Sequence, residues 1–235
     1  MTKTPTRVQA RLAAVRERIA KACDASGRAR ESVTLVAVSK TQLAQAVQEA
    51  IDAGQRHFGE NYLQEGVAKI GAVSPSPGLV WHFIGPIQSN KTRPIAEHFA
   101  WVHAVDREKI ARRLSEQRPP HLPPLNVCLQ VNVSGEASKS GVTPTEVLAL
   151  AQVVATLPGL RLRGLMALPE PADDFESQRK PFALLRALQQ QLVEAGIPTD
   201  TLSMGMSADM DAAIAEGATI VRIGTAIFGK RDYAK

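Results

Sequence analysis

The sequence contains little that would suit a membrane or nucleic-acid-binding protein. No apolar run approaches the roughly 20 residues that a membrane-spanning helix needs. Aromatic residues make up only 4% of the chain, so few rings are available to stack on single-stranded bases. The net charge of +5 does not alter this, because Lys and Arg alternate with Glu and Asp, as in Arg16-Glu17-Arg18. We therefore expect neither a membrane anchor nor a nucleic-acid partner.

Cysteine is also scarce. Cys23 falls in a helical pattern and Cys128 in an apolar run, where buried reduced thiols are common. Residues 1–11 are polar and basic and lack the apolar core of a signal peptide. These features predict a cytoplasmic protein with no disulfide between Cys23 and Cys128.

What the sequence does contain is a regular alternation of short β-branched runs and amphipathic helices. An opening helix carries Val8, Leu12, Val15 and Ile19 at helical spacing, and Gly27 is its stop signal. Strands are then predicted at residues 33–38, 57–59, 80–84, 101–104, 125–133, 160–165, 201–203 and 220–223. Helices are predicted at residues 43–53, 62–70, 90–98, 107–117, 145–156, 182–195 and 210–216.

This βαβ rhythm is typical of a parallel sheet. The linker-like segments 74–78, 118–124 and 169–174 are loops between elements, and none is long enough to separate two domains. Eight strands in 235 residues leave no spare segment for a second domain. We therefore expect an α/β protein in which residues 1–235 form a single (β/α)8 TIM barrel, not an open doubly wound sheet.

Lys40 lies where the first predicted strand meets the next helix, which we expect Ser39 or Thr41 to cap and Gly54 to close. The start of a helix disfavours a charged ammonium. A lysine with a lowered pKa, however, supplies the neutral amine that forms a Schiff base with an aldehyde. Barrel enzymes also hold their reactive groups at this end of the strands. The alternative is a surface lysine in a βα loop.

Two segments near the C-terminus suit an anion, and they follow the seventh and eighth strands, where barrels frequently bind phosphate. Ser207 is placed to cap a helix, and Gly224 lets the backbone come close to a ligand. The alternative is an ordinary capped helix and turn, and Asp209 and Asp211 oppose an anion there. Arg222 needs a partner if it enters the barrel: an anionic cofactor or a structural carboxylate.

Eight segments in this order carry a resemblance that covers nearly the whole chain. They are Ala37-Val38-Ser39-Lys40, Phe58-Gly59-Glu60-Asn61-Tyr62, Trp81-His82-Phe83-Ile84-Gly85, Gln88-Ser89-Asn90-Lys91, Ser138-Lys139-Ser140-Gly141, Gly164-Leu165-Met166, Met204-Gly205-Met206-Ser207 and Arg222-Ile223-Gly224-Thr225-Ala226-Ile227-Phe228-Gly229. With them the chain resembles the pyridoxal phosphate homeostasis protein family. One departure is Ile87, where the family more often has leucine of similar volume.

The resemblance implies a barrel similar to the N-terminal domain of alanine racemase, the type III fold of pyridoxal-phosphate proteins, with an extra N-terminal helix. Lys40 would hold pyridoxal 5′-phosphate as a Schiff base. Ser207, Gly224 and Thr225 would hold its phosphate, and Arg222 would lie near the phosphate or the pyridine nitrogen. No metal is implied.

Two further residues, Asn61 and His82, would line the cofactor pocket by the same resemblance. For His82 the alternative is a hydrogen-bonded core residue, which is common for a histidine in an apolar strand. Family members store, deliver or buffer pyridoxal phosphate and influence amino-acid and keto-acid balance without assigned turnover. We therefore expect a monomeric vitamin B6 homeostasis protein, with no catalytic residues, whose partners are the cofactor and apo forms of pyridoxal-phosphate enzymes.

Two enzymatic alternatives remain. An amino-acid racemase needs a second base opposite the cofactor lysine, usually a tyrosine. The chain offers only Tyr62 and Tyr233, and it lacks the C-terminal β-domain of alanine racemases. A barrel aldolase would use Lys40 on a sugar phosphate.

Overall fold

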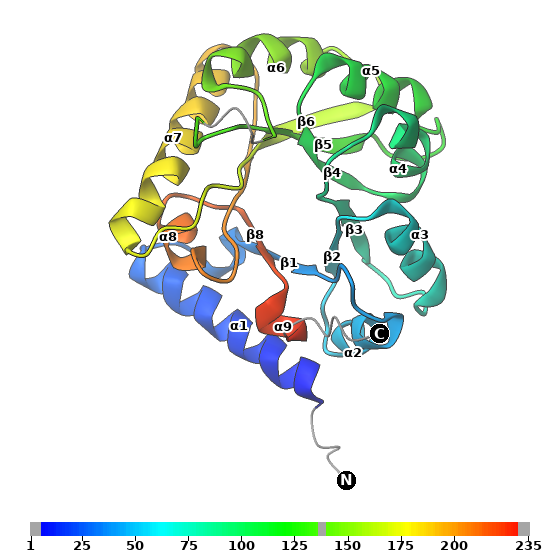
Figure 1. Cartoon of the computed structure of the whole chain (residues 1–235), viewed down its shortest axis with the longest axis vertical. Helices are drawn as coiled ribbons and strands as arrows, with labels where there is room; N and C mark the ends of the chain where they lie inside the picture. Colours follow the sequence, from blue (N-terminus) through cyan, green and yellow to red (C-terminus); the bar gives the residue numbers. More distant parts are fainter. Residues whose placement is uncertain (1–5, 136–139, 230–235) are drawn as a thin grey trace.

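Eight parallel strands close into a barrel with helices around its outside, in the computed structural model that describes residues 6–135 and 140–229 (Figure 1). The strands are β1 (Thr34–Val38), β2 (His57–Glu60), β3 (Val80–Phe83), β4 (Trp101–Val105), β5 (Leu125–Gln130), β6 (Leu160–Met166), β7 (Thr201–Ser203) and β8 (Ile220–Ile223). The α-helices are α1 (Arg7–Ala25), α2 (Ala44–Asp52), α3 (Leu63–Ala72), α4 (Thr92–His98), α5 (Glu108–Gln117), α6 (Val147–Ala155), α7 (Phe175–Glu194), α8 (Met210–Ala215) and α9 (Thr225–Phe228). Short 3-10 helices are η1 (Arg30–Ser32), η2 (Ser89–Lys91) and η3 (Pro144–Glu146). The (β/α)8 barrel expected from the sequence is confirmed.

The strands follow one another around the barrel in chain order, and β1 closes the ring by pairing with β8. Val36 lies opposite Arg222 in that pair, and Ala37 lies opposite Phe58 in β2. Because all pairs are parallel, the strands all end at the same rim, called here the carboxyl rim. The opposite rim, where the strands begin, is called the amino rim.

Helix α1 precedes the barrel and packs on the helices at the other end of the chain, α8 and α9 (Figure 1). Thr6 and Gln9 form a capping box at its start. Its buried face carries Val8, Leu12, Val15 and Ile19, as predicted, and Gly27 follows it with a φ of 63°. The extra N-terminal helix is therefore confirmed.

Some predicted boundaries were wrong. Strand β5 ends at Gln130 and not at residue 133, because Val131, whose N–H still donates to Met166 of β6, forms only a single bridge, with Val142. Helix α7 begins at Phe175, seven residues before the predicted start, with Asp174 as its cap. Helix α9 was not predicted at all, since its four residues are too few to show a periodic pattern.

The capping of α2 was also predicted wrongly. Its N-cap is Leu43, which makes no side-chain capping bond, so neither Ser39 nor Thr41 caps the helix. Thr41 instead adopts a φ of 64°, which adds a turn between β1 and α2. Gly54 does close the helix, with a φ of 81° and its N–H donated to the carbonyl of Ile51.

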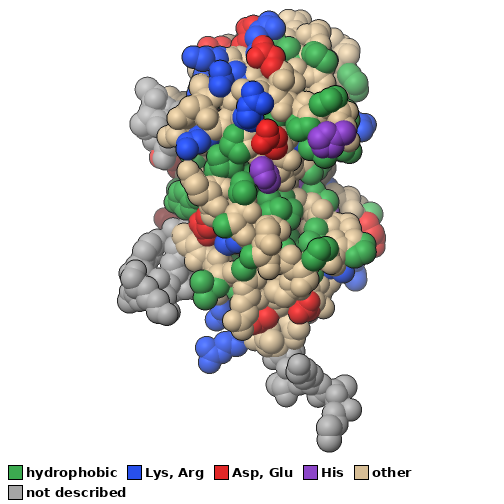
Figure 2. All heavy atoms as spheres, turned by 90° about the vertical axis from the view of Figure 1, so that its right-hand side faces the viewer, with side chains coloured by type: hydrophobic (Ala, Val, Ile, Leu, Met, Phe, Trp, Pro, Cys, Tyr) green, Lys and Arg blue, Asp and Glu red, His purple; other side chains and the backbone are tan. Residues whose placement is uncertain are grey.

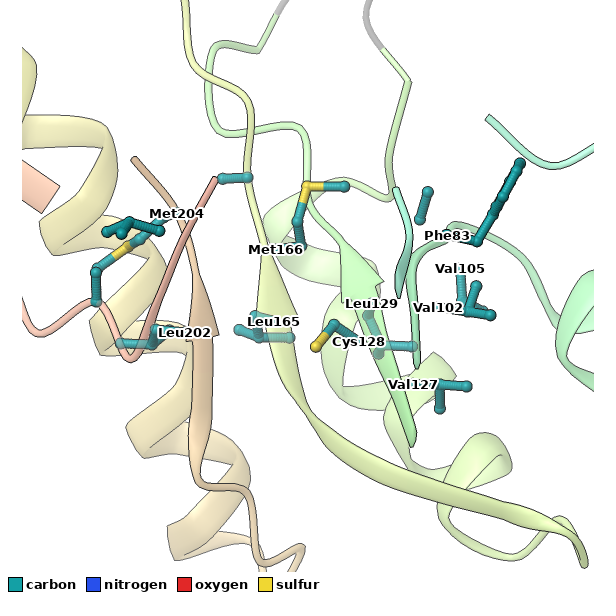
Figure 3. Close-up of a cluster of buried hydrophobic side chains, with 14 of the residues drawn as sticks. Phe83, Val102, Val105, Val127, Cys128, Leu129, Leu165, Met166, Leu202 and Met204 are labelled. Atoms are coloured by element: carbon teal, nitrogen blue, oxygen red, sulfur yellow. The ribbon is translucent and has the colours of Figure 1, made fainter. Parts of the chain in front are cut away.

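The main hydrophobic core lies between the barrel and the surrounding helices. Apolar strand residues meet the buried faces of the helices. Figure 3 shows a cluster of the buried hydrophobic side chains: Phe83, Val102, Val105, Val127, Cys128, Leu129, Leu165, Met166, Leu202 and Met204. Cys23 and Cys128 are buried and carry free thiols. None of the described helices has the length and apolarity needed to cross a bilayer. On the face shown in Figure 2, basic and acidic side chains are interspersed.

The inside of the barrel is more polar than this outer layer. His103 of β4 lies 2.7 Å from Ser203 of β7, and since these strands are not neighbours in the sheet, the contact crosses the interior. His82 and Arg222 are buried in the same hydrogen-bonded set.

Gly164 permits the close pairing of β6 and β7. A Cβ at this position would lie 1.8 Å from the backbone oxygen of Thr201. We expect Gly164→Ala to lower the free energy of unfolding by roughly 2–4 kcal/mol, measured by urea denaturation. The matched control is Gly71→Ala in α3, where a Cβ would meet nothing within 4 Å. That variant should be stabilised by about 0.5–1 kcal/mol, and equal effects at the two glycines would contradict the packing argument.

Candidate functional site

Barrel closure brings Lys40 beside the segment that follows β8. Lys40 comes two residues after β1 ends, and it lines one hollow at the carboxyl rim with Val38, Gln42, Gly224, Thr225 and Gly229. Three residues predicted for the cofactor site, Lys40, Gly224 and Thr225, thus lie together although about 185 positions separate them in the sequence.

The hollow at Lys40 is small, with a volume of about 40 Å³. A water molecule needs about 10–15 Å³, so this space accepts a group the size of a phosphate and a larger ligand would extend over the open rim. A larger hollow, about 390 Å³, lies elsewhere and is lined by residues of α6, β6 and the segment before β7. The Lys40 hollow is therefore the candidate site because of the residues that line it, Lys40, Gly224 and Thr225, and not because of its size.

Gly224 fits this place because there is little room for a side chain. A Cβ on Gly224 would lie 3.1 Å from the backbone oxygen of Val38, two residues before Lys40 in the chain. Thr225 follows as the exposed first residue of α9. The first N–H groups of a helix have no acceptor within it, so the backbone and the hydroxyl of Thr225 both offer donors here.

Ser207 does not play the capping role expected from the sequence. The N-cap of α8 is Asp209, whose carboxylate accepts the N–H of Met206 at 2.6 Å. The carbonyl of Ser207 accepts a hydrogen bond from Arg18 at 2.7 Å. Ser207 lines a mainly apolar hollow of about 220 Å³ between α1 and the end of β8, and Ile223 and Ala226 line the same hollow.

Arg222 enters the barrel interior, where it is only 4% exposed. Its guanidinium donates to the Ser203 hydroxyl at 2.6 Å and to the Ala167 carbonyl at 2.9 Å, both at the carboxyl ends of strands. Burial lowers its pKa to about 10, so it stays protonated at neutral pH. Within residues 6–135 and 140–229 no carboxylate forms an ion pair with it, which disfavours the structural-carboxylate alternative.

Three histidines continue this hydrogen-bonded set toward the amino rim. His103 Nδ1 lies 2.7 Å from Ser203 Oγ, His103 Nε2 lies 2.9 Å from His82 Nδ1, and His82 Nε2 lies 3.0 Å from His57 Nδ1. Burial lowers the pKa of His103 to about 3 and that of His82 well below its ordinary value. Each of these buried imidazoles is therefore neutral, with one donor and one acceptor nitrogen.

Arg222 favours one direction for these hydrogen bonds. A guanidinium can only donate, so Ser203 Oγ accepts from it. The imidazole tautomers that turn their lone pairs toward this cation are electrostatically favoured, and in them Ser203 donates to His103 Nδ1, His103 Nε2 to His82, and His82 Nε2 to His57. We call these five residues the interior chain: Arg222, Ser203, His103, His82 and His57.

The structure places His82 in this interior chain, where it also stacks on Trp101. It lines a hollow of about 240 Å³ at the amino rim, together with His57 and Arg163, and not the hollow that Lys40 lines. Sequence reasoning missed His57, His103 and Ser203. The signal was available, because each is a polar residue inside a predicted strand.

Asn61 lies at the carboxyl rim, directly after β2. Its backbone packs against Gly85, where a Cβ would come within 2.2 Å of the Asn61 oxygen. Its side-chain Oδ1 is buried and makes no hydrogen bond within the described part of the chain. Tyr62, the candidate second base of a racemase, is 54% exposed at the start of α3, and Tyr233 lies outside the described residues. Ser138 and Lys139 of the predicted motifs also lie outside them.

Known proteins resemble the chain over most of its length. A family model described as "Alanine racemase, N-terminal domain" matches residues 10–232. A pyridoxal phosphate homeostasis protein of Pseudomonas aeruginosa is 64% identical over 222 residues, which are 94% of this chain and 95% of that protein. The protein of that name in Vibrio cholerae is 57% identical over 231 residues, 97% of this chain and 98% of that protein.

Two solved structures share the fold of the chain. PipY of Synechococcus elongatus, determined with PLP bound, has a TM-score of 0.83 and 37% identity, and the match covers 94% of this chain and 100% of PipY. Alanine racemase from Corynebacterium glutamicum has a TM-score of 0.71 at 15% identity, and the match covers 95% of this chain and 63% of the racemase. The latter likeness shows the fold alone.

The interior chain predicts a pH-dependent stability. The pKa of His103 is about 3 in the folded protein and its ordinary value is 6.5, so between these pH values the unfolded chain binds more protons. The free energy of unfolding should therefore fall with falling pH, by about 1.4 kcal/mol per pH unit from this residue. His103→Gln should remove that part of the slope between pH 6 and about 4, as measured by urea denaturation. The exposed His98→Gln is the control, and equal slopes for wild type and His103→Gln would refute the assignment.

Proposed function

The chain belongs to the pyridoxal phosphate homeostasis protein family, and from this premise we propose that it binds pyridoxal 5′-phosphate on Lys40 and stores, delivers or buffers this cofactor. The observation that carries the proposal is the meeting of Lys40 with Gly224 and Thr225 at one hollow of the carboxyl rim. A lysine amine beside backbone and hydroxyl donors suits a ligand that has both an aldehyde and a phosphate.

When bound, pyridoxal phosphate supplies an aldehyde for a Schiff base with an amine, and an anionic phosphate. Thr225 would donate its hydroxyl and backbone N–H to that phosphate, and Gly224 leaves room for it. Ser207 would complete the phosphate site from the other side. Two neighbours of the Gly224-Thr225 pair, Ile223 and Ala226, share a hollow with Ser207, which supports this arrangement.

Arg222 would face the pyridine nitrogen or the phosphate from inside the barrel. Its guanidinium is a permanent donor, so a nitrogen that accepts from it is kept unprotonated and the ring becomes a weak electron sink. Such a ring suits a protein that holds the cofactor more than one that turns over amino acids. Asn61 would line the pocket at the carboxyl rim. His82 would act indirectly, through His103 and Ser203, which orient Arg222.

A racemase is the second candidate function. The relatives reported above carry the name of homeostasis proteins, and alanine racemase shares only the fold. A second base would have to face the Lys40 amine across the substrate, and Tyr62 is largely exposed at the start of α3. We therefore propose a cytoplasmic, monomeric cofactor carrier whose partners include apo forms of pyridoxal-phosphate enzymes. Steady conversion of L-alanine to D-alanine by the loaded protein would decide for the racemase.

Lys40 can be tested by chemical trapping. The loaded protein should be yellow, and borohydride should fix the cofactor on the peptide that contains Lys40, as identified by mass spectrometry. Lys40→Ala should lose both the colour and the label, because it removes the amine. The exposed Lys109→Ala in α5 is the control and should keep both. An undiminished colour in Lys40→Ala would place the cofactor on another residue.

The phosphate site can be tested by comparing two ligands. Thr225→Val removes a hydroxyl while nearly keeping the shape of the side chain. A hydrogen bond to a charged group contributes about 1.5–3 kcal/mol, so the dissociation constant for pyridoxal phosphate should rise roughly tenfold or more. Pyridoxal, which has no phosphate, should bind both proteins equally in the same absorbance titration. If the affinities for pyridoxal phosphate and pyridoxal fell equally in Thr225→Val, the result would contradict a phosphate site at Thr225.

A further inference from the structure

The loop that carries Lys40 is held by a buried ionic cluster on the barrel's outer side. Lys69 of α3 places its Nζ 2.5 Å from the carbonyl oxygen of Ser39, 2.9 Å from Glu60 Oε1 and 2.6 Å from Glu65 Oε1. The cluster Glu60, Glu65 and Lys69 thus joins the end of β2 and helix α3 to the residue before Lys40.

The same cluster also holds the residue after Lys40. Glu65 Oε1 accepts the backbone N–H of Thr41, and the Ser39 hydroxyl donates to Glu60 Oε1 at 2.6 Å. The Ser39 carbonyl belongs to the peptide group before Lys40, and the Thr41 N–H belongs to the peptide group after it. Both peptide groups that flank Lys40 are therefore fixed by charged side chains.

The fixed conformation is one that the loop would not choose by itself. Thr41 has a φ of 64°, and it is the one non-glycine residue with a positive φ within residues 6–135 and 140–229. A β-branched side chain makes that region unfavourable. Backbone strain of this kind persists only where the surroundings impose it, and it gathers at functional sites. The hydrogen bond that the Thr41 N–H donates to the Glu65 carboxylate is such an imposed contact.

The cluster is also an unfavourable way to attach a helix to a strand. The side chains of Glu60 and Lys69 are 0% and 6% exposed, and burial raises the pKa of Glu60. Apolar side chains of similar volume usually hold such a contact equally well or better, because burying charges removes their hydration. Phe58 and Phe99 are among the fully buried apolar side chains around the same elements. Packing alone therefore does not account for the ions.

We propose that Glu60, Glu65 and Lys69 are positioning residues for Lys40: by fixing both flanking peptide groups they present its amine to the carboxyl rim in the orientation that the aldehyde requires. This inference rests on the proposed function of Lys40. It predicts that damage to the cluster slows covalent capture of pyridoxal phosphate while leaving non-covalent recognition of the phosphate intact.

Glu65 offers the sharpest test, because its side chain is 28% exposed and its removal leaves Lys69 with Glu60 and Ser39. Apoprotein is mixed with pyridoxal phosphate, and the rate of covalent capture is followed by absorbance and by borohydride-fixed label on Lys40. Glu65→Ala should slow capture about tenfold. Glu65→Gln should restore most of the rate, because its amide oxygen still accepts from Thr41. Glu97→Ala, an exposed carboxylate of α4, should match wild type.

Pyridoxine 5′-phosphate separates positioning from a general structural role, because it has the phosphate but no aldehyde. Its dissociation constant should change by less than about twofold in Glu65→Ala. The double variant Glu60→Gln with Lys69→Met tests the cluster without leaving an unpaired buried charge, and it should also slow capture. Capture at the wild-type rate in both Glu65→Ala and the double variant would overturn the inference, as would equal losses of capture and pyridoxine 5′-phosphate binding. A wild-type protein that captures no cofactor would instead overturn the proposed function.

Discussion

The pairing of β1 with β8 is the contact on which the candidate site depends. It joins the first and last strands of the barrel in parallel, so their carboxyl ends, and with them Lys40 and Gly224, meet at one rim. The two ends approach closely, since a Cβ at Gly224 would lie 3.1 Å from the Val38 carbonyl oxygen. Helix α1 reinforces the same place from outside by packing on α8 and α9. A reactive amine and a set of anion donors thus become neighbours through topology and not through sequence proximity.

Two buried cations near this rim are satisfied in different ways. Lys69 forms ion pairs with two carboxylates, Glu60 and Glu65, and its charge is therefore balanced within the protein. The resulting cluster holds the Lys40 loop. Arg222 donates to a hydroxyl and a carbonyl and forms no ion pair within the described residues, although the Asp209 carboxylate acts on its charge without a direct contact. The first arrangement fixes geometry, and the second leaves positive potential at the place where an anionic ligand is proposed to bind.

The barrel was predictable from the sequence because its strands are short apolar runs at regular spacing, and the resemblance named the family correctly. Some local features were not predicted. The strand β5 stops before the apolar residue Val131, which forms only a single bridge with Val142. Helix α7 continues through Pro181, because the Asp174 cap and buried residues such as Phe182 outweigh one missing backbone bond. Lys40 and Gly224 could be placed at the same rim because each follows a predicted barrel strand, and the resemblance assigned both to one cofactor. The contacts of the Lys69 cluster and of the chain of histidines could not be predicted, since the first joins helix α3 to β2 and to the loop after β1, and the second joins different strands, at distances that only the closed barrel determines. Which of the named residues touch the cofactor stays a prediction.

The direction of the hydrogen bonds along the interior chain has an electrostatic consequence. In the tautomers that the guanidinium favours, the dipoles of His103 and His82 align with their negative ends facing Arg222 and their N–H groups facing the amino rim. Oriented dipoles of this kind replace part of the water that a cation loses on burial, without removing its net charge. The histidines thus serve as an internal solvation shell that lets Arg222 remain charged in the barrel and attract an anionic ligand at the carboxyl rim.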